Sequence, residues 1–193
     1  MQIEEIAEYV WLHSKEIEFG DSHQWDENLF LAEWAKNKPF ATQWRNAAAG
    51  WYWFLVDMNY EELHDVVKPP SLPQKGCNIG LLTHSNMEVF GETLLCSDSS
   101  GITVIYNGHE ANVTSRIRSH FALNNNKTGA LGLSHYPLSN RKWFVRYFSS
   151  NCFTDILEND RLRVELLMNS KSGRCAVEHA WRVNHGWPVL CKE

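Results

Sequence analysis

The sequence lacks the features that would place it in a membrane, a secreted scaffold or a repeat family. No window approaches the roughly 20 apolar residues of a membrane-spanning helix. The first 19 residues are acidic, unlike a basic signal peptide. The five cysteines are scattered and form no CxxC pair, which argues against a disulfide framework and a thiolate zinc site. We therefore expect a cytoplasmic protein with reduced thiols.

What remains is the composition of an ordinary globular domain with uneven charge. The 193 residues are 44% hydrophobic and 21% charged, enough for one good core, and we expect a single domain over residues 1–193. The net charge is −5, but residues 1–100 hold 6 Lys or Arg against 16 Asp or Glu, whereas residues 101–193 hold 12 against 7. The second half is therefore the half suited to bind a polyanion such as nucleic acid.

The distribution of apolar residues predicts an α+β fold with a small, three-stranded, mainly antiparallel sheet flanked by helices. Strands are expected at Trp51–Asp57, Ile102–Asn107 and Lys142–Phe148. The first of these is apolar on both faces, as a central strand covered by helices is. Closing helices are expected over Asp155–Met168 and Arg174–Asn184.

Two further segments precede or interrupt this core. Residues 1–49 are expected to form a helical extension with two amphipathic segments. Their apolar positions are Ile3, Ile6, Val10 and Ile17, and then Leu29, Phe30 and Trp34. Residues from about 58 to 101 form an insertion between the first two core strands. It contains a loop with three prolines, Lys68–Gly76, and candidate short strands at Asn78–Thr83 and Thr93–Cys96.

The most informative stretch is YNGHEANVTSRIRSHF, residues 106–121, which sets one tyrosine, one arginine and one histidine where a single phosphate could meet them all. Alternating residues predict a strand that ends at Asn107, and Gly108 is expected to break it. Asn112 is a suitable N-cap for a helix that runs to about Leu123. The stretch is therefore predicted to form a strand, a tight turn and a helix.

The predicted helix separates its apolar and polar residues. Val113, Ile117 and Phe121 recur at every fourth position and are expected to form the buried stripe. Arg116 and His120, also four residues apart, share another face, so both side chains can reach one anion. This arrangement indicates phosphodiester chemistry.

These residues resemble the motifs of the GIY-YIG nuclease family. The triplet YNG at residues 106–108 stands in place of YIG, Arg116 follows its glycine by eight residues, and His120 comes four residues later. The triplet GWY at residues 50–52 is similar to the GIY strand. The segment AVEHAWRVNHGWPVLC is similar to the closing helix and turn, and this places Glu178 as the metal-binding carboxylate. The resemblance covers residues 50–191, with 53 residues between the two tyrosines as an insertion.

The resemblance implies a magnesium-dependent nuclease, with manganese as the substitute ion. Glu178 would hold the ion, because a lone carboxylate with phosphate oxygens and waters suits a hard cation. Arg116 would grip the phosphate with its planar fork. Tyr52 and Tyr106 would line the water side, one of them positioning or deprotonating the nucleophile, and His120 would assist proton transfer or hydrogen-bond the phosphate. A tyrosine with an ordinary pKa near 10 would need a metal or an arginine nearby to lower it.

Two residue assignments have competitors. Glu165, in the segment RLRVELLMN, is the second choice for the metal carboxylate, after Glu178, which GWPVLC follows at the family-like distance. Cys191 stands where the family has an asparagine after the closing proline. Asn184 and Asn151 are the candidates to take the role of that asparagine.

A compact chain of this kind looks most like a stand-alone type II restriction endonuclease of the family. Such an enzyme would cut double-stranded DNA as a homodimer, because two strands call for two active sites. Arg118, Lys127, Arg141 and Lys142 are the basic residues that we expect on the DNA. Two alternatives are a structure-specific repair or phage nuclease, and a catalytically inactive DNA-binding relative.

Overall fold

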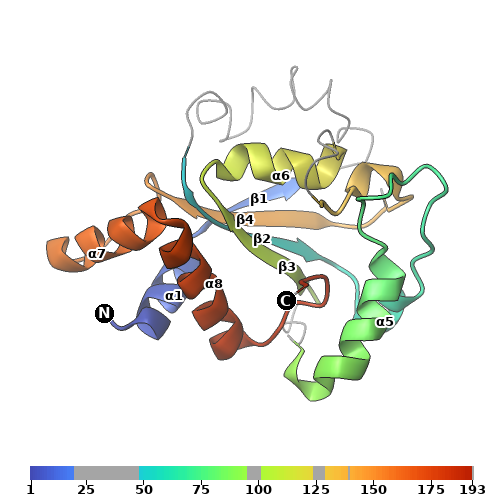
Figure 1. Cartoon of the computed structure of the whole chain (residues 1–193), viewed down its shortest axis with the longest axis horizontal. Coiled ribbons are helices and arrows are strands. Elements are labelled where there is room, and N and C mark those ends of the chain that lie inside the picture. Colours follow the sequence, from blue (N-terminus) through green and yellow to red (C-terminus); the bar gives the residue numbers. More distant parts are fainter. Residues whose placement is uncertain (20–47, 95–100, 124–128, 139, 193) are drawn as a thin grey trace.

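The structure, a computed structural model, describes residues 1–19, 48–94, 101–123, 129–138 and 140–192. Its centre is a four-stranded antiparallel sheet in the order β1-β4-β2-β3 (Figure 1). The strands are β1 (Lys15–Phe19), β2 (Gly50–Val56), β3 (Thr103–Glu110) and β4 (Trp143–Ser149). The α+β class is confirmed, but the predicted count of three strands is wrong, because β1 joins the sheet beside β4.

The fourth strand comes from the segment that was expected to be wholly helical. Helix α1 (Ile3–Leu12) buries Ile6 and Val10 as expected, and the chain then pairs with β4 through β1. Ile17 therefore lies in a strand and not in a helix. Burial in β1 alternates, with Ile17 and Phe19 inside and the residues before each of them exposed, which is the period of a strand. The second expected helix, near residues 29–34, lies outside the described residues.

The insertion between β2 and β3 is helical where short strands were expected. It holds α4 (Tyr60–His64), the three-proline loop, α5 (Ile79–Phe90) and the 3₁₀ turn η2 (Gly91–Thr93). The predicted strand at residues 78–83 is wrong, because the Asn78 side chain accepts a hydrogen bond from the Leu81 N–H (3.4 Å) and caps α5. The predicted strand at residues 93–96 is also wrong over its described part, where η2 ends and Leu94 makes a single bridge to Trp187.

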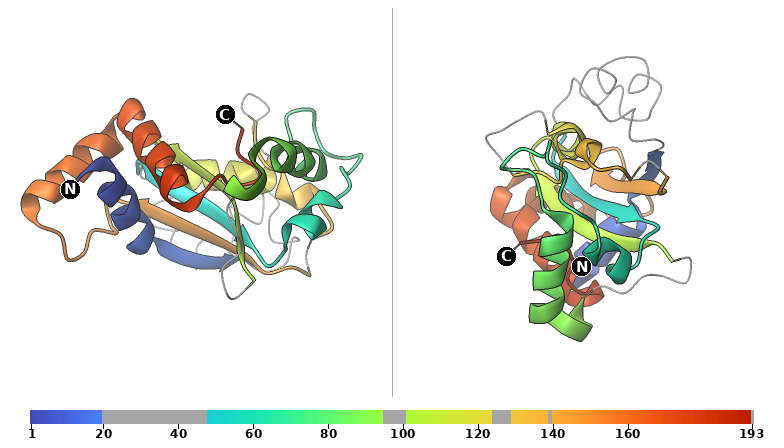
Figure 2. Two further views of the ribbon diagram at one scale, coloured as in Figure 1. Left: turned by 90° about the horizontal axis from the view of Figure 1, so that it is seen from below. Right: turned by 90° about the vertical axis from the view of Figure 1, so that its right-hand side faces the viewer.

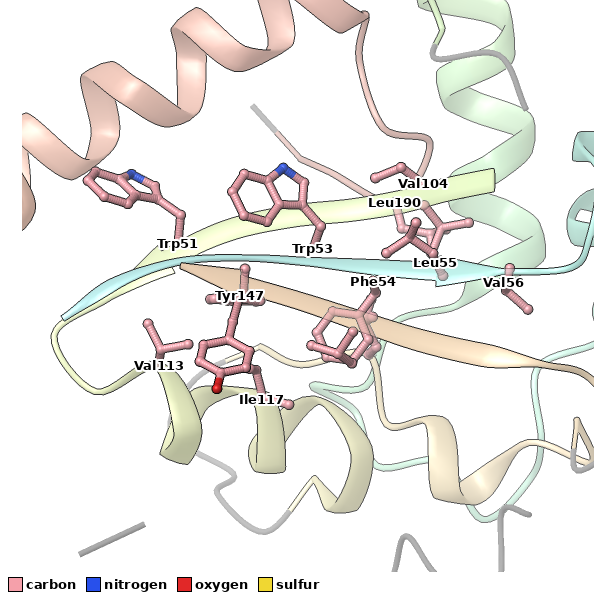
Figure 3. Packing of buried hydrophobic residues seen from close by; sticks show 14 of the residues in the cluster. Trp51, Trp53, Phe54, Leu55, Val56, Val104, Val113, Ile117, Tyr147 and Leu190 are labelled. Carbon is pink, nitrogen blue, oxygen red and sulfur yellow. The ribbon is translucent and has the colours of Figure 1, made fainter. Parts of the chain in front are cut away.

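Helices cover both faces of the sheet. Helix α6 (Val113–Ala122) lies on one face, and α1 and α8 (Lys171–His185) lie on the other (Figure 1). Helix α7 (Glu158–Asn169) packs on α8 and projects from the end of the molecule away from α5 (Figure 2). In Figure 3, Trp51 and Trp53 of β2 point toward α8, whereas Phe54 points toward α6. Every residue of β2 is buried, which confirms the predicted central strand.

The helix of the informative stretch forms as its sequence predicts. The Asn112 side chain accepts a hydrogen bond from the Ser115 N–H (3.1 Å), and Val113, Ile117 and Phe121 are buried. The two closing helices are also confirmed, with small differences in their bounds. No helix within the described ranges is both long and apolar enough to cross a membrane.

The segment of residues 187–191, which follows α8, runs beside β3, the strand at the end of the sheet. The Leu190 N–H donates to the Ile105 carbonyl oxygen (2.8 Å), and the Asn107 N–H donates to Cys191 Sγ (3.3 Å). The segment therefore covers the side of β3 that faces away from β2.

Candidate functional site

The two tyrosines of the triplets lie on neighbouring strands and on the same face of the sheet. Strands β2 and β3 are antiparallel, with Tyr52 opposite Gly108 and Phe54 opposite Tyr106. The Tyr52 and Tyr106 rings stack with their centroids 6.1 Å apart, and both contact His120 of α6. The functional hypothesis requires adjacent strands and a shared face, and both are present.

Gly108 has a different role from the one its sequence position suggested. Strand β3 continues through it to Glu110, so the predicted break is wrong. A Cβ atom at Gly108 would lie 2.6 Å from the Tyr52 hydroxyl oxygen and 3.1 Å from the Tyr106 ring. Glycine at this position therefore gives the two tyrosine rings the room to stack beside β3.

His120 is buried and neutral, and it hydrogen-bonds to Tyr52. Its Nε2 lies 3.0 Å from the Tyr52 hydroxyl oxygen, and its Nδ1 accepts a hydrogen bond from the Leu131 N–H (3.3 Å). Because Nδ1 is the acceptor, the neutral ring carries its proton on Nε2 and donates it to Tyr52. Burial, and then the charge of Arg116, lower the pKa of His120 well below 6.5, in keeping with a neutral ring.

Arg116 joins the two tyrosine hydroxyls. Its guanidinium hydrogen-bonds to both, and its Nη2 donates to the Gly129 carbonyl oxygen (2.7 Å). The Tyr52 hydroxyl also hydrogen-bonds to that of Tyr106, so His120, Tyr52 and Tyr106 form a continuous chain. Burial raises the pKa of both tyrosines, that of Tyr106 to about 12, so both hydroxyls are protonated at neutral pH.

Glu178 approaches these groups from α8, on the other side of the sheet. Its Oε1 accepts a hydrogen bond from Arg182 Nη2, and its Oε2 lies 3.7 Å from His109 Nε2. Burial, and then Arg174, lower the pKa of His109 to about 4, so this contact joins a carboxylate to a neutral ring and is not an ion pair. Burial raises the pKa of Glu178, although Arg182 acts in the opposite direction.

A cavity of about 240 Å³ lies where the residues from the two sides of the sheet meet at β3. Of the five predicted site residues, Tyr106, His120 and Glu178 line it. Tyr52 and Arg116 are not part of its lining and reach it through their hydrogen bonds to Tyr106. The rest of the wall combines basic and apolar side chains, among them Lys75, Arg182 and Lys192, and Leu82, Leu131 and Leu190.

Arg182 and Cys191 of the cavity wall form a connected group with Asn107, and the sequence alone predicted no such group. Asn107 Oδ1 accepts a hydrogen bond from Arg182 Nε (2.9 Å) and lies 3.2 Å from Cys191 Sγ. Asn184 and Asn151, the candidates for the role of the family's asparagine, lie away from Cys191. Asn184 donates to the Glu4 carbonyl oxygen (3.2 Å), and Asn151 accepts from the Ser149 hydroxyl (2.8 Å). The side-chain amide beside Cys191 comes from the middle of the YNG triplet. The sequence feature that could have identified Arg182 is its position four residues after Glu178, because side chains at this spacing are neighbours on a helix.

Glu165, the competitor of Glu178, lies on α7 and pairs with Arg161 (3.0 Å) in an exposed ion pair. It is not part of the cavity lining. Among the described residues, no three His, Cys, Asp or Glu side chains are grouped to hold a metal ion. Glu178 Oε2 can supply one oxygen ligand to a hard cation such as Mg²⁺, which takes its other ligands from water and phosphate.

The residues expected on the DNA have different surroundings. Arg141 pairs with Glu62 (2.7 Å), Lys142 is exposed at the start of β4, and Arg118 is half-buried on α6. Lys127 lies outside the described residues. Other basic residues of this half also have structural contacts, since Arg146 lies 3.9 Å over the Trp11 ring. The positive charge of the second half is therefore only partly available to a ligand.

Comparison with known proteins adds no relative to this description. No protein-family model, no curated protein and no solved structure matches the chain. Its function is therefore inferred from the residues that line or support the cavity and from the chemistry that they can perform.

Proposed function

We propose that this protein is a magnesium-dependent endonuclease that hydrolyses DNA phosphodiester bonds with a site of the GIY-YIG type. One observation carries the proposal: three of the five motif residues line a single cavity, and the other two hydrogen-bond to one of those three. Tyr52, Tyr106, Arg116 and His120 are linked by hydrogen bonds, and Glu178 shares the cavity with Tyr106 and His120.

Hydrolysis of a phosphodiester needs a group that takes a proton from water and fixed positive charge for the phosphate. The water oxygen forms a bond to phosphorus as the bond to the leaving oxygen breaks, and that oxygen is protonated as it leaves. Tyr106 lines the cavity, and its hydroxyl hydrogen-bonds to both Tyr52 and Arg116, which stabilise its phenolate form. Tyr106 is therefore the residue that positions the water and takes its proton.

The pKa of Tyr106, about 12, must fall for this role at neutral pH. After burial and Cys191, the charge of Glu178 is among the influences that raise it. Glu178 would hold a magnesium ion, whose charge would stabilise the phosphate and reverse that influence. The Leu131 N–H, which donates to Nδ1, keeps the proton of neutral His120 on Nε2, where it is donated to the Tyr52 oxygen. His120 therefore orients Tyr52 and supports Tyr106 through it.

The substrate that we propose is double-stranded DNA, cut by a homodimer in the manner of a type II restriction endonuclease. One cavity cuts one strand, so two copies related by a twofold axis would cut both strands of a palindromic site. Digestion of plasmid with magnesium tests this. Discrete fragments support the proposal, cuts confined to flaps or single strands indicate a structure-specific nuclease, and intact plasmid indicates an inactive DNA-binding protein.

The paired variants Glu178→Ala and Glu165→Ala test the assignment of the metal carboxylate. Glu178→Ala should abolish magnesium-dependent cleavage, because it removes the one carboxylate among the described residues of the cavity lining. Glu165→Ala should cleave normally, because it only breaks an exposed pair with Arg161. A gel shift in chelator should show that both variants still bind DNA. Full loss with Glu165→Ala and normal cleavage with Glu178→Ala would move the metal role to Glu165.

A further inference from the structure

Arg182 is a buried guanidinium in the wall of the cavity, and the proposed reaction gives it no role. Its side chain is 5% exposed. Its Nε donates to Asn107 Oδ1 (2.9 Å), its Nη2 donates to Glu178 Oε1, and the guanidinium also hydrogen-bonds to the Cys191 side chain and lies 4.3 Å over the Trp187 ring. A guanidinium carries more N–H donors than these contacts use, so donors remain for a ligand in the cavity.

The groups that hold Arg182 are themselves fixed. Asn107 is placed by β3 and by its contacts with Cys191 Sγ, which lies 3.3 Å from its N–H and 3.2 Å from its Oδ1. The Trp187 ring stacks on Phe90 with centroids 4.9 Å apart. The guanidinium is therefore held in one place before any ligand arrives, as a site for binding a rigid anion requires.

Arg182 and Arg116 differ in their access to the cavity. Arg182 is part of the lining, whereas Arg116 is not, and Arg116 is engaged by the Gly129 carbonyl oxygen and both tyrosine hydroxyls. Arg116, which the sequence assigned to the phosphate, thus supports the tyrosines. Arg182 faces the cavity, and the sequence analysis gave it no role.

We propose that Arg182 binds a phosphate oxygen of the substrate and that Glu178 neutralises Arg182 until a cation occupies the carboxylate. The proposal rests on the proposed function in taking the ligand to be a phosphate. With Glu178 ionised and paired, the two side chains have no net charge, and the carboxylate repels a phosphate. A cation on the carboxylate cancels that repulsion, so the cation and the phosphate should each strengthen the binding of the other.

Titration with inorganic phosphate, without metal and at fixed ionic strength, isolates this interaction from catalysis. Four proteins form a double-mutant cycle: wild type, Glu178→Gln, Arg182→Gln and the double variant. Glu178→Gln should bind phosphate about tenfold tighter than wild type or more, because it removes a charge next to the ligand. Adding Arg182→Gln should lower that affinity by about 10- to 100-fold, the loss expected for a hydrogen bond to a charged group.

The Arg161–Glu165 pair is a matched control, because it is also an arginine and a glutamate four residues apart on one helix, but on exposed α7. The same cycle at this pair should leave phosphate affinity unchanged. Suppose that the double variant binds phosphate more tightly than Arg182→Gln by the same factor as Glu178→Gln exceeds wild type. The loss of the Glu178 charge alone would then explain the tighter binding, and the proposal would be overturned. If Arg182→Gln does not fold, Glu178→Gln/Arg182→Lys must bind phosphate more weakly than Glu178→Gln alone, and equal affinity overturns the proposal.

The two proposals fail in different ways. Intact plasmid together with the expected phosphate cycle would refute the nuclease and leave Arg182 as an anion-binding residue. Normal cleavage together with a phosphate affinity that does not depend on Arg182 would refute the Arg182 proposal and leave the nuclease.

Discussion

Replacing Gly108 with alanine should destabilise the protein by displacing Tyr52. The new Cβ would lie 2.6 Å from the Tyr52 hydroxyl oxygen and 2.8 Å from its Cζ. These atoms belong to a rigid ring that is 1% exposed and hydrogen-bonded to His120, so moving the ring would strain this bond and the buried packing around it. Overpacking of this kind costs about 1–3 kcal/mol.

Thermal and urea unfolding measure this cost directly. In a domain of this size each kcal/mol lowers Tm by about 2–4 °C, so Gly108→Ala should melt roughly 2–12 °C below wild type. Gly129→Ala is the control, because its Cβ would meet only the Lys75 carbonyl oxygen at an ordinary 3.8 Å. We expect the stability of this control to stay within about 0.5 kcal/mol of wild type.

A double variant tests the cause. In Tyr52→Phe the nearest clashing atom is absent, so Gly108→Ala should cost less in that background than in wild type. A Gly108→Ala protein as stable as the Gly129→Ala control would refute the reasoning, and with it the view that this glycine makes room for the stacked tyrosines. Strictly additive costs would show that the alanine destabilises the strand by another route.

Two further predictions concern the polar groups around Tyr52. Arg116→Lys should cleave nearly as slowly as Arg116→Ala, about 10²- to 10³-fold below wild type, because the donors of a lysine all leave one nitrogen and do not reproduce the planar fork that spans both tyrosines and the Gly129 carbonyl oxygen. Single-turnover cleavage beside a gel shift measures this, and near wild-type turnover would place the site elsewhere. Burial, and then Arg116, hold the pKa of His120 well below 6.5, so the unfolded chain takes up this proton first, and stability that is present above pH 6.5 is lost as the pH falls. Below pH 6.5 the loss is about 1 kcal/mol per pH unit, and His120→Gln should remove this contribution. Urea unfolding of wild type and His120→Gln from about pH 7.5 to 5.5 measures it, and an equal loss of stability in the two proteins would contradict the prediction.

The sheet could be predicted where a pattern had one structural meaning. The aromatic-rich apolar runs of β2 and β4 favour strands, and Asn112 followed by an apolar residue at every fourth position favours a capped helix. Ile17 was different, because it lies seven residues after Val10 and so continues the spacing of α1. Only the alternation of exposed Glu16 and Glu18 with buried Ile17 and Phe19 shows the strand.

The start of α5 was ambiguous for a related reason. A short apolar run has no decisive period, and the cap at Asn78 was the feature that identified a helix. In the site, the contact of Tyr52 with Tyr106 followed from two adjacent strands. The contact of Arg182 with Asn107 depends on how α8 crosses the sheet and on the path of residues 187–191. The spacing of residues along the sequence predicts neither of these.

The segment of residues 187–191 has a consequence for solution behaviour. An uncovered end strand can pair with a strand of another molecule and so begin aggregation. Here Leu190 and Cys191 occupy the free side of β3 and also form part of the cavity wall. Detachment of this segment would open the cavity and expose an aggregation-prone edge in the same event, so conditions that loosen it should cost activity and solubility together.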